Sequence, residues 1–123
     1  MAQRAQLFVW DDLPTDQPMA RIDRKRIIGS QMMLSHVTLH KGFKVGVHTH
    51  ENEQFAVLLS GRMVFTLEDG PDGASRTIEM TAGSVLHLPS NVPHGAEAVE
   101  TSVILDLFSP PSEKTGVDKT PSE

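Results

Sequence analysis

Short apolar runs between glycines and prolines recur along most of the chain, and this pattern constrains the fold more than any other feature. The runs are rich in Val, Ile, Leu and Phe, and almost none shows the i, i+3, i+4 recurrence of an amphipathic helix. Regularly spaced short strands favour an all-β sandwich or barrel. Strands are predicted over residues 7–10, 26–29, 32–40, 44–48, 54–59, 62–68, 76–80, 84–88 and 96–108.

Turn signals and composition divide the chain into a domain and a tail. Ser60-Gly61 predicts a tight hairpin, and the polar, glycine-rich segment 68–73 predicts a longer turn between antiparallel neighbours. The length of 123 residues suits a single domain, which we expect over 1–108 with 1–31 supplying edge or dimer strands. Residues 109–123 are polar and proline-rich, which predicts a flexible tail.

Charge and composition disfavour several classes of function. The net charge is -5, and apart from Arg24-Lys25-Arg26 the eleven Lys and Arg are scattered, so a nucleic-acid partner is not expected. There is no cysteine, which leaves His, amide and carboxylate groups as metal ligands. The N-terminal apolar run 7–10 is too short for a signal peptide or membrane span, so we expect a cytoplasmic protein without a membrane partner.

Two blocks of spaced residues within the predicted strands carry histidines. In the first block two histidines stand two positions apart, and residues i and i+2 of a strand point to the same face. Their ring nitrogens can therefore aim at one point, as metal ligands do, with an amide oxygen as a third donor. The first block runs Gly42, five residues, His48, Thr49, His50, three residues, Gln54, six residues, Gly61; the second runs Gly83, five residues, Pro89, Ser90, Asn91, two residues, His94.

Paired histidines in a strand often occur without a metal, so the pair alone is weak evidence. The flanking glycines and the distant proline and histidine make coincidence a poor explanation. Glu51 and Glu53 do not compete with Gln54 as ligands, because only Gln54 shares strand parity with the histidines and keeps the six-residue spacing to Gly61. Both glutamates are expected to face solvent or to orient a ligand imidazole. The competing interpretation is a barrel that keeps these residues for packing.

These two blocks resemble the paired motifs of the cupin superfamily over residues 32–108. The motif positions match except that Gln54 replaces a glutamate, Asn91 a glycine and Ala98 an asparagine. The resemblance implies a single-domain jelly-roll β-barrel, also called a double-stranded β-helix, with a metal near its mouth. It also implies one divalent transition metal ion, open between Zn, Ni, Fe, Mn and Cu, held by His48, His50, Gln54 and His94.

The exchange of glutamate for Gln54 changes the expected chemistry of such a site. An amide oxygen brings no charge, so the ion keeps its full positive charge and becomes a stronger Lewis acid than with a carboxylate ligand. That suits the polarisation of an oxygen on an anionic substrate better than the two-histidine, one-carboxylate chemistry of iron oxygenases.

Within the cupins, the segments 88–95 and 105–111 resemble the KdgF-type proteins, which open the ring of 4,5-unsaturated monouronates. This resemblance implies that Asp106 and Phe108 line the pocket, Asp106 as a catalytic group and Phe108 as a substrate contact. Family members commonly carry arginine after Ser-Pro-Pro, and this chain has Ser112 there. The cation expected beside a sugar carboxylate is therefore missing from that position.

Asp106 interrupts the apolar run 103–108, where a carboxylate without a partner would be costly. Facing inward, it could move a proton between substrate atoms beside the metal. In the alternative arrangement Val103, Leu105 and Leu107 face the core and Asp106 faces solvent. His87 is a further candidate substrate contact if its strand face is inward.

The sequence favours an enzyme that opens or isomerises a small anionic carbohydrate such as an unsaturated uronate. Two alternatives stay open, namely a metal-dependent dioxygenase of a small organic substrate and a module that binds a small ligand without converting it. A homodimer is expected, because an all-β chain has terminal strand edges to protect.

Overall fold

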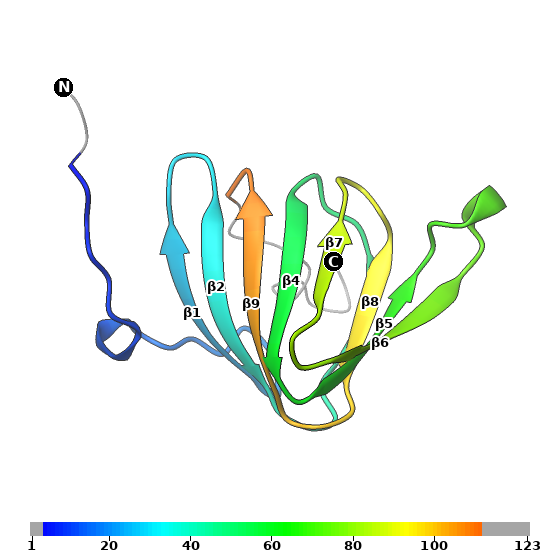
Figure 1. Cartoon of the computed structure of the whole chain (residues 1–123), viewed down its shortest axis with the longest axis horizontal. Coiled ribbons are helices and arrows are strands. Elements are labelled where there is room, and N and C mark those ends of the chain that lie inside the picture. The colour runs from blue at the N-terminus through cyan, green and yellow to red at the C-terminus, as the bar shows by residue number, and fades with distance from the viewer. Residues whose placement is uncertain (1–3, 112–123) are drawn as a thin grey trace.

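The computed structural model describes residues 4–111, which form two antiparallel sheets packed against each other (Figure 1). The five-stranded sheet has the order β1 (Ile22–Ile28), β2 (Met33–Leu39), β9 (Ser102–Ser109), β4 (Glu53–Ser60) and β7 (Val85–Leu88). The four-stranded sheet has the order β3 (Lys44–His48), β8 (His94–Ala98), β5 (Arg62–Leu67) and β6 (Arg76–Thr81). Two short 3-10 turns, η1 (Trp10–Asp12) and η2 (Pro71–Gly73), complete the described elements.

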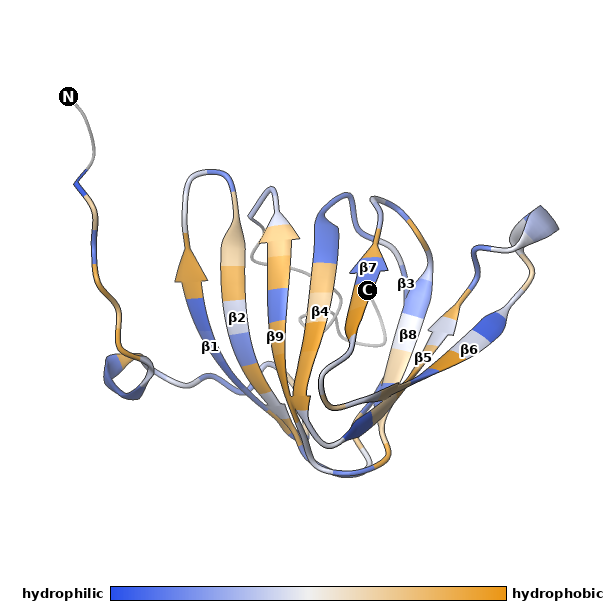
Figure 2. Cartoon of the chain, viewed as in Figure 1, coloured by the Kyte–Doolittle hydropathy of each residue, from blue (hydrophilic) through white to orange (hydrophobic). Residues whose placement is uncertain are grey.

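Alternation of buried and exposed side chains within the strands explains how the sheets pack. Along β2, every second residue from Met33 to Leu39 is buried. Figure 2 shows apolar residues concentrated in the strands, while the connections between them are mostly polar. Inward side chains of both sheets form one core, and full burial of a residue such as Leu58 contributes about 2 kcal/mol. The expected all-β jelly-roll fold is confirmed.

The N-terminal part of the chain differs from its prediction. Residues 7–10 do not form a strand. Residues 7–9 belong to a segment that extends away from the sheets, and Trp10 begins η1 (Figure 1). Leu7 is 93% exposed, whereas the ring of Trp10 packs against that of His36 on β2. β1 begins at Ile22 instead of residue 26, because all seven of its residues pair with β2 despite its charged sequence.

The predicted strand over 96–108 is in fact two strands in different sheets, β8 and β9. The backbone N–H groups of Val99 and Glu100 both donate to the carbonyl of Arg62, at 3.1 and 3.3 Å, and turn the chain between the sheets. This turn contains neither glycine nor proline, so the sequence gives no sign of it. The crossing matters for the site, since it places residues of β8 and β9 on opposite walls of one cavity.

The Ser60-Gly61 turn is not a hairpin, which corrects the prediction. It links β4 and β5, which lie in different sheets, and so forms a corner. Gly61 has a φ of +92°, and a Cβ there would collide with Thr101 and Ser102. The glycine is therefore required both by its dihedral angle and by close packing. The predicted turn over 68–73 does connect the antiparallel neighbours β5 and β6.

The predicted tail over 109–123 falls mainly outside the described residues. Ser109 is the last residue of β9, while residues 112–123, including Ser112, are not described. Within 4–111, no helix has the length and apolar character that a membrane crossing requires.

Candidate metal centre

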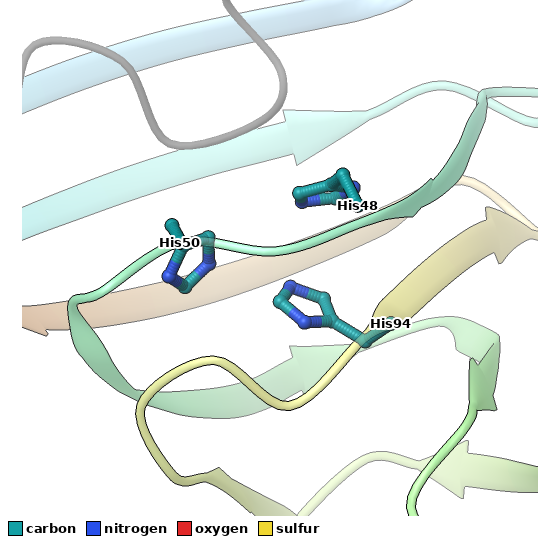
Figure 3. A group of neighbouring side chains, drawn as sticks. All are labelled: His48, His50 and His94. Carbon is teal, nitrogen blue, oxygen red and sulfur yellow. The ribbon is translucent and has the colours of Figure 1, made fainter. Parts of the chain in front are cut away.

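Three histidines, at the end of β3, in the loop that follows it and at the start of β8, converge on one point (Figure 3). His48 is the last residue of β3, His50 follows in the next loop, and His94 begins β8 opposite His48. The ring centroid of His94 lies 4.5 Å from that of His48 and 4.9 Å from that of His50. The candidate ligand nitrogens all lie within 4.8 Å of one another, which suits three ligands of one cation.

Each of the three rings is oriented by a backbone carbonyl two residues away. The Nδ1 atom of His48 lies 2.8 Å from the oxygen of Gly46, and those of His50 and His94 lie 2.9 Å from the oxygens of Asn52 and Val92. A carbonyl only accepts, so each Nδ1 carries the proton and each Nε2 keeps its lone pair. Such bonds fix the tautomer and direction of metal-ligating histidines.

The Nε2 atom of His50 provides the test of whether a metal fits. It is buried and has no hydrogen-bond partner among the described residues. An unsatisfied buried acceptor is costly, and a cation between the three rings would remove that cost. The donor set, three imidazole nitrogens and an oxygen, suits a divalent transition metal.

Burial also prepares the histidines electrostatically for a metal. Desolvation lowers the pKa of His94 to about 4. The pKa of His50 is lowered as well, again mainly by burial. Both rings are therefore neutral near pH 7, and neutral imidazole is the form that binds metal.

Gln54 connects the histidines to Asp106. It is buried on β4, and its Nε2 donates a hydrogen bond of 2.9 Å to Oδ1 of Asp106. Because the amide nitrogen faces Asp106, the amide oxygen is turned the other way. Gln54 also raises the pKa of His50 slightly against the larger lowering by burial, although no hydrogen bond with standard geometry joins the two side chains. The amide thus lies between the three rings and the carboxylate.

Asp106 faces inward, which decides between the two arrangements open from the sequence. On β9 it stands opposite Ser35 of β2 and Ala56 of β4, and both of these residues are buried. Desolvation raises the pKa of its carboxyl to about 6, against the opposing effect of the Gln54 hydrogen bond. Phe108 is buried on the same face, and its ring lies nearly perpendicular to that of His50, with 5.7 Å between centroids.

Asp106, Phe108 and two of the histidines line one cavity between the sheets. Its empty volume, including the part open to solvent, is about 560 Å³. Most of the wall is apolar. The polar side chains in it are Arg24, Ser35, His48, Gln54, His94 and Asp106.

His87 is not brought to this cavity, which corrects the expectation that it contacts substrate. Its ring stacks on Phe55 with 4.7 Å between centroids, and its Nε2 lies 2.7 Å from a carboxylate oxygen of Glu53. Its neighbours Leu86 and Leu88 point the opposite way, Leu88 into the core, so strand parity turns His87 outward. Glu51 and Glu53 are both exposed, as expected.

Two asparagines that support His50 were missed as site residues. Asn52 is buried, its side chain donates to the carbonyl of Pro110, and its own carbonyl accepts from His50. Asn91 donates its backbone N–H to the His50 carbonyl at 2.9 Å and has a φ of +66°. Asparagine tolerates this conformation, which explains how it replaces the motif glycine. The presence of Asn91 where the motif has glycine was the signal in the sequence that could have identified this residue.

Arg24 is the third residue that the sequence did not identify. It is only 4% exposed and lines the cavity, although Arg24-Lys25-Arg26 reads as a solvated charge run. The available signal was its parity with Ile22, which is also buried on β1.

Fold and site together define a cupin, and the chain belongs to this family, because residues 35–108 match the cupin domain. Among solved structures it is similar to KdgF from Halomonas sp., with 25% identity, a TM-score of 0.77, and coverage of 88% of this chain and 97% of KdgF. The resemblance to KdgF expected from the sequence is confirmed. No match was found among curated proteins.

Two further solved structures share the fold. An RmlC-like cupin from Shewanella frigidimarina is 22% identical with a TM-score of 0.76, over 92% of this chain and 97% of that one. Oxalate decarboxylase from Lactobacillus farciminis is 18% identical with a TM-score of 0.78, over 93% of this chain and 36% of that one. The histidine group and this family support a site for a divalent metal, with its identity still a prediction among Zn, Ni, Fe, Mn and Cu.

Proposed function

We propose that the protein is a metal-dependent enzyme that opens or isomerises a small anionic carbohydrate such as a 4,5-unsaturated uronate. The observation that carries the proposal is the convergence of three histidines beside a cavity whose wall also holds Asp106, hydrogen-bonded to Gln54. Similarity to KdgF supports the same chemistry.

A divalent cation held by His48, His50, His94 and the amide oxygen of Gln54 would supply Lewis acidity toward a substrate oxygen. The protein's own part is the transfer of a proton. In the proposed ring opening, the anomeric hydroxyl loses its proton, the bond from C1 to the ring oxygen breaks, and the resulting enol carbon gains a proton. Atoms balance without a co-reactant.

Asp106 is suited to both halves of this transfer. A carboxyl with a pKa of about 6 is present in both forms close to neutral pH, so it can accept the hydroxyl proton and return it to carbon. The Gln54 amide orients the carboxylate from one side, and Phe108 gives an apolar wall that limits water around the reacting atoms. We therefore assign Asp106 as the catalytic residue and Phe108 as a substrate contact.

The proposal is tested by the ultraviolet absorbance of an unsaturated uronate, under argon, with protein loaded with a redox-inert divalent ion. Turnover is expected, and Asp106→Asn should lower kcat by about 10²-fold or more while elemental analysis finds the same metal content. His87→Gln is the control and should keep full activity, since its ring lies outside the cavity.

Two results would contradict the proposal. Oxygen consumption that requires iron would identify a dioxygenase instead. Recovery of several candidate sugar acids unchanged, after long incubation with metal-loaded protein that binds them, would identify a binding module.

A further inference from the structure

Ser35 carries the one buried polar side chain in the described part of the chain that makes no hydrogen bond. It lies on β2, is 2% exposed, and lines the cavity together with Asp106. Its hydroxyl group bonds to no other residue within 4–111. The other buried polar side chains all have partners, namely those of Arg24, Asn52, Gln54, His94 and Ser102. Because a buried hydroxyl without a partner costs free energy, its presence in the cavity wall requires an explanation.

Strand register places this hydroxyl beside the carboxyl group of Asp106. Ser35 on β2 and Asp106 on β9 stand directly opposite each other, and side chains paired in this way have Cβ atoms about 4.5 to 5.5 Å apart. Asp106 accepts a hydrogen bond from Gln54 through Oδ1, and its other oxygen accepts none from a described residue. The wall therefore presents a hydroxyl group and a carboxylate oxygen side by side, and both can meet a ligand in the cavity.

The protein groups around Ser35 do not provide a partner for its hydroxyl. On its other side, Ser35 stands opposite Arg26 of β1, whose Nη2 lies 3.6 Å from the carboxylate of Asp16. Across the cavity, the other sheet contributes the rings of His48 and His94. The remaining inward residues of β2 are buried and apolar, namely Met33, Val37 and Leu39. A polar group of a bound ligand is the partner that is left.

Ser102 shows how a buried serine with a structural role is bonded in this chain. It is fully buried on β9, and its Oγ accepts from the N–H of Arg62 at 3.0 Å. The same hydroxyl donates toward the carbonyls of Arg62 and Glu100, at 3.2 and 2.9 Å. These bonds hold the turn between β8 and β9, whereas the hydroxyl of Ser35 holds no backbone segment in place.

We propose that Ser35 forms a hydrogen bond with a hydroxyl group of the substrate and selects hydroxylated sugar acids over their deoxy analogues. This inference rests on the proposed function and extends it to substrate selection. A serine hydroxyl donates and accepts, as does a sugar hydroxyl, so the two groups are complementary. Because Asp106 is the direct neighbour of Ser35, the substrate hydroxyl lies close to the carbon that receives the proton.

The lack of a partner in the free protein is what makes the selection effective. A substrate with the matching hydroxyl satisfies Ser35 in the complex. An analogue without that hydroxyl leaves the serine buried and unpaired, and sites of this kind discriminate strongly against the analogue.

The test measures the binding of galacturonate and of its 2-deoxy, 3-deoxy and 4-deoxy analogues to metal-loaded protein by titration calorimetry. Wild type should bind one of the analogues at least about 10-fold more weakly than galacturonate. In Ser35→Ala, discrimination against that analogue should fall to about 3-fold or less, because galacturonate binding weakens while metal content is unchanged. Ser35→Cys fills the space with a weak hydrogen-bonding group and should behave like Ser35→Ala, which separates the bond from the loss of volume.

Ser102→Ala is the matched control, because it removes another buried serine hydroxyl outside the cavity. Discrimination should be unchanged in this variant, while its Tm should fall by several degrees, since three hydrogen bonds are lost. The Tm of Ser35→Ala should stay within about 2 °C of wild type, because no bond in the free protein is removed.

The proposal is overturned if a folded Ser35→Ala variant keeps the full discrimination, or if Ser35→Ala and Ser102→Ala lose it equally. Wild type that binds none of the four acids, or that does not distinguish them, also overturns it. The binding readout does not depend on turnover. Loss of discrimination in Ser35→Ala, in a protein that converts no unsaturated uronate, would contradict the proposed function and leave the role of Ser35 intact. Turnover by Ser35→Ala with an unchanged KM would retain the function and remove the role.

Discussion

At the level of single residues, the hydrogen bond from Gln54 to Asp106 couples the candidate metal centre to the candidate proton carrier. Gln54→Glu would remove the donor and bring two carboxyl groups together, which raises the pKa of one of them. It would also add negative charge to the metal site and weaken its Lewis acidity. We expect kcat to fall about 10-fold or more with metal retained, measured by uronate turnover and elemental analysis.

A double variant separates the electrostatic cause from simple disruption. Gln54→Glu combined with Asp106→Asn restores a donor and an acceptor with their roles exchanged. Thermal stability lost in the Gln54→Glu variant should return, while turnover should not, because the proton carrier is gone. An undiminished kcat in the Gln54→Glu variant would contradict the Lewis-acid argument.

Residue types and spacing were enough to single out His48, His50 and His94, whose side chains the structure brings together, while Gln54 as a fourth ligand stays a prediction. The convergence of the three rings is what the structure adds. Asp106 was ambiguous, since its run is apolar on both parities. Arg24 was missed, because its parity with the apolar Ile22 was the one signal, and a buried arginine and a solvated one otherwise look alike in a sequence.

At the level of elements, the corner between β4 and β5 depends on Gly61. Gly61→Ala should lower the free energy of unfolding by about 3 kcal/mol, since it adds steric overlap with Thr101 and Ser102 to dihedral strain. Gly83 has nearly the same φ, +93°, and no atom within 4 Å of an added Cβ, so Gly83→Ala should cost only about 1 kcal/mol. Urea denaturation of both variants measures the difference, and equal losses would show that packing at the corner is unimportant.

The pattern of apolar and polar residues located most strands, but it did not show which strands pair with one another. Residues 32–40, 44–48 and 54–59 were predicted close to β2, β3 and β4, and in β2 and β4 buried residues alternate with more exposed ones. The change of sheet after β4 and the break between β8 and β9 escaped prediction. Both are set by contacts distant in sequence, such as the bonds from Val99 and Glu100 to Arg62.

At the level of the whole molecule, the candidate ligands come from both sheets, three from the region of β3 and β8 and one from β4. A cation bound by all four would join the two sheets across the cavity. The homodimer expected from the sequence stays a prediction.

Because the four ligands meet only in the folded chain, metal should bind the native state far better than the unfolded one. At a free metal concentration 100 times Kd, the native state gains about 2.7 kcal/mol, which corresponds to a rise in Tm of roughly 10 °C for a domain of this size. Scanning calorimetry of chelator-treated protein, with and without added metal, measures the rise.

His36 offers the control for this experiment, because its ring packs against Trp10 with 5.1 Å between centroids and does not belong to the histidine group. His36→Ala should keep the metal-dependent rise in Tm, whatever it does to the starting value. His48→Ala should reduce the rise to a small fraction, since one of three imidazole ligands is lost. An equal rise in both variants would place the metal elsewhere on the molecule and separate the histidine group from metal binding.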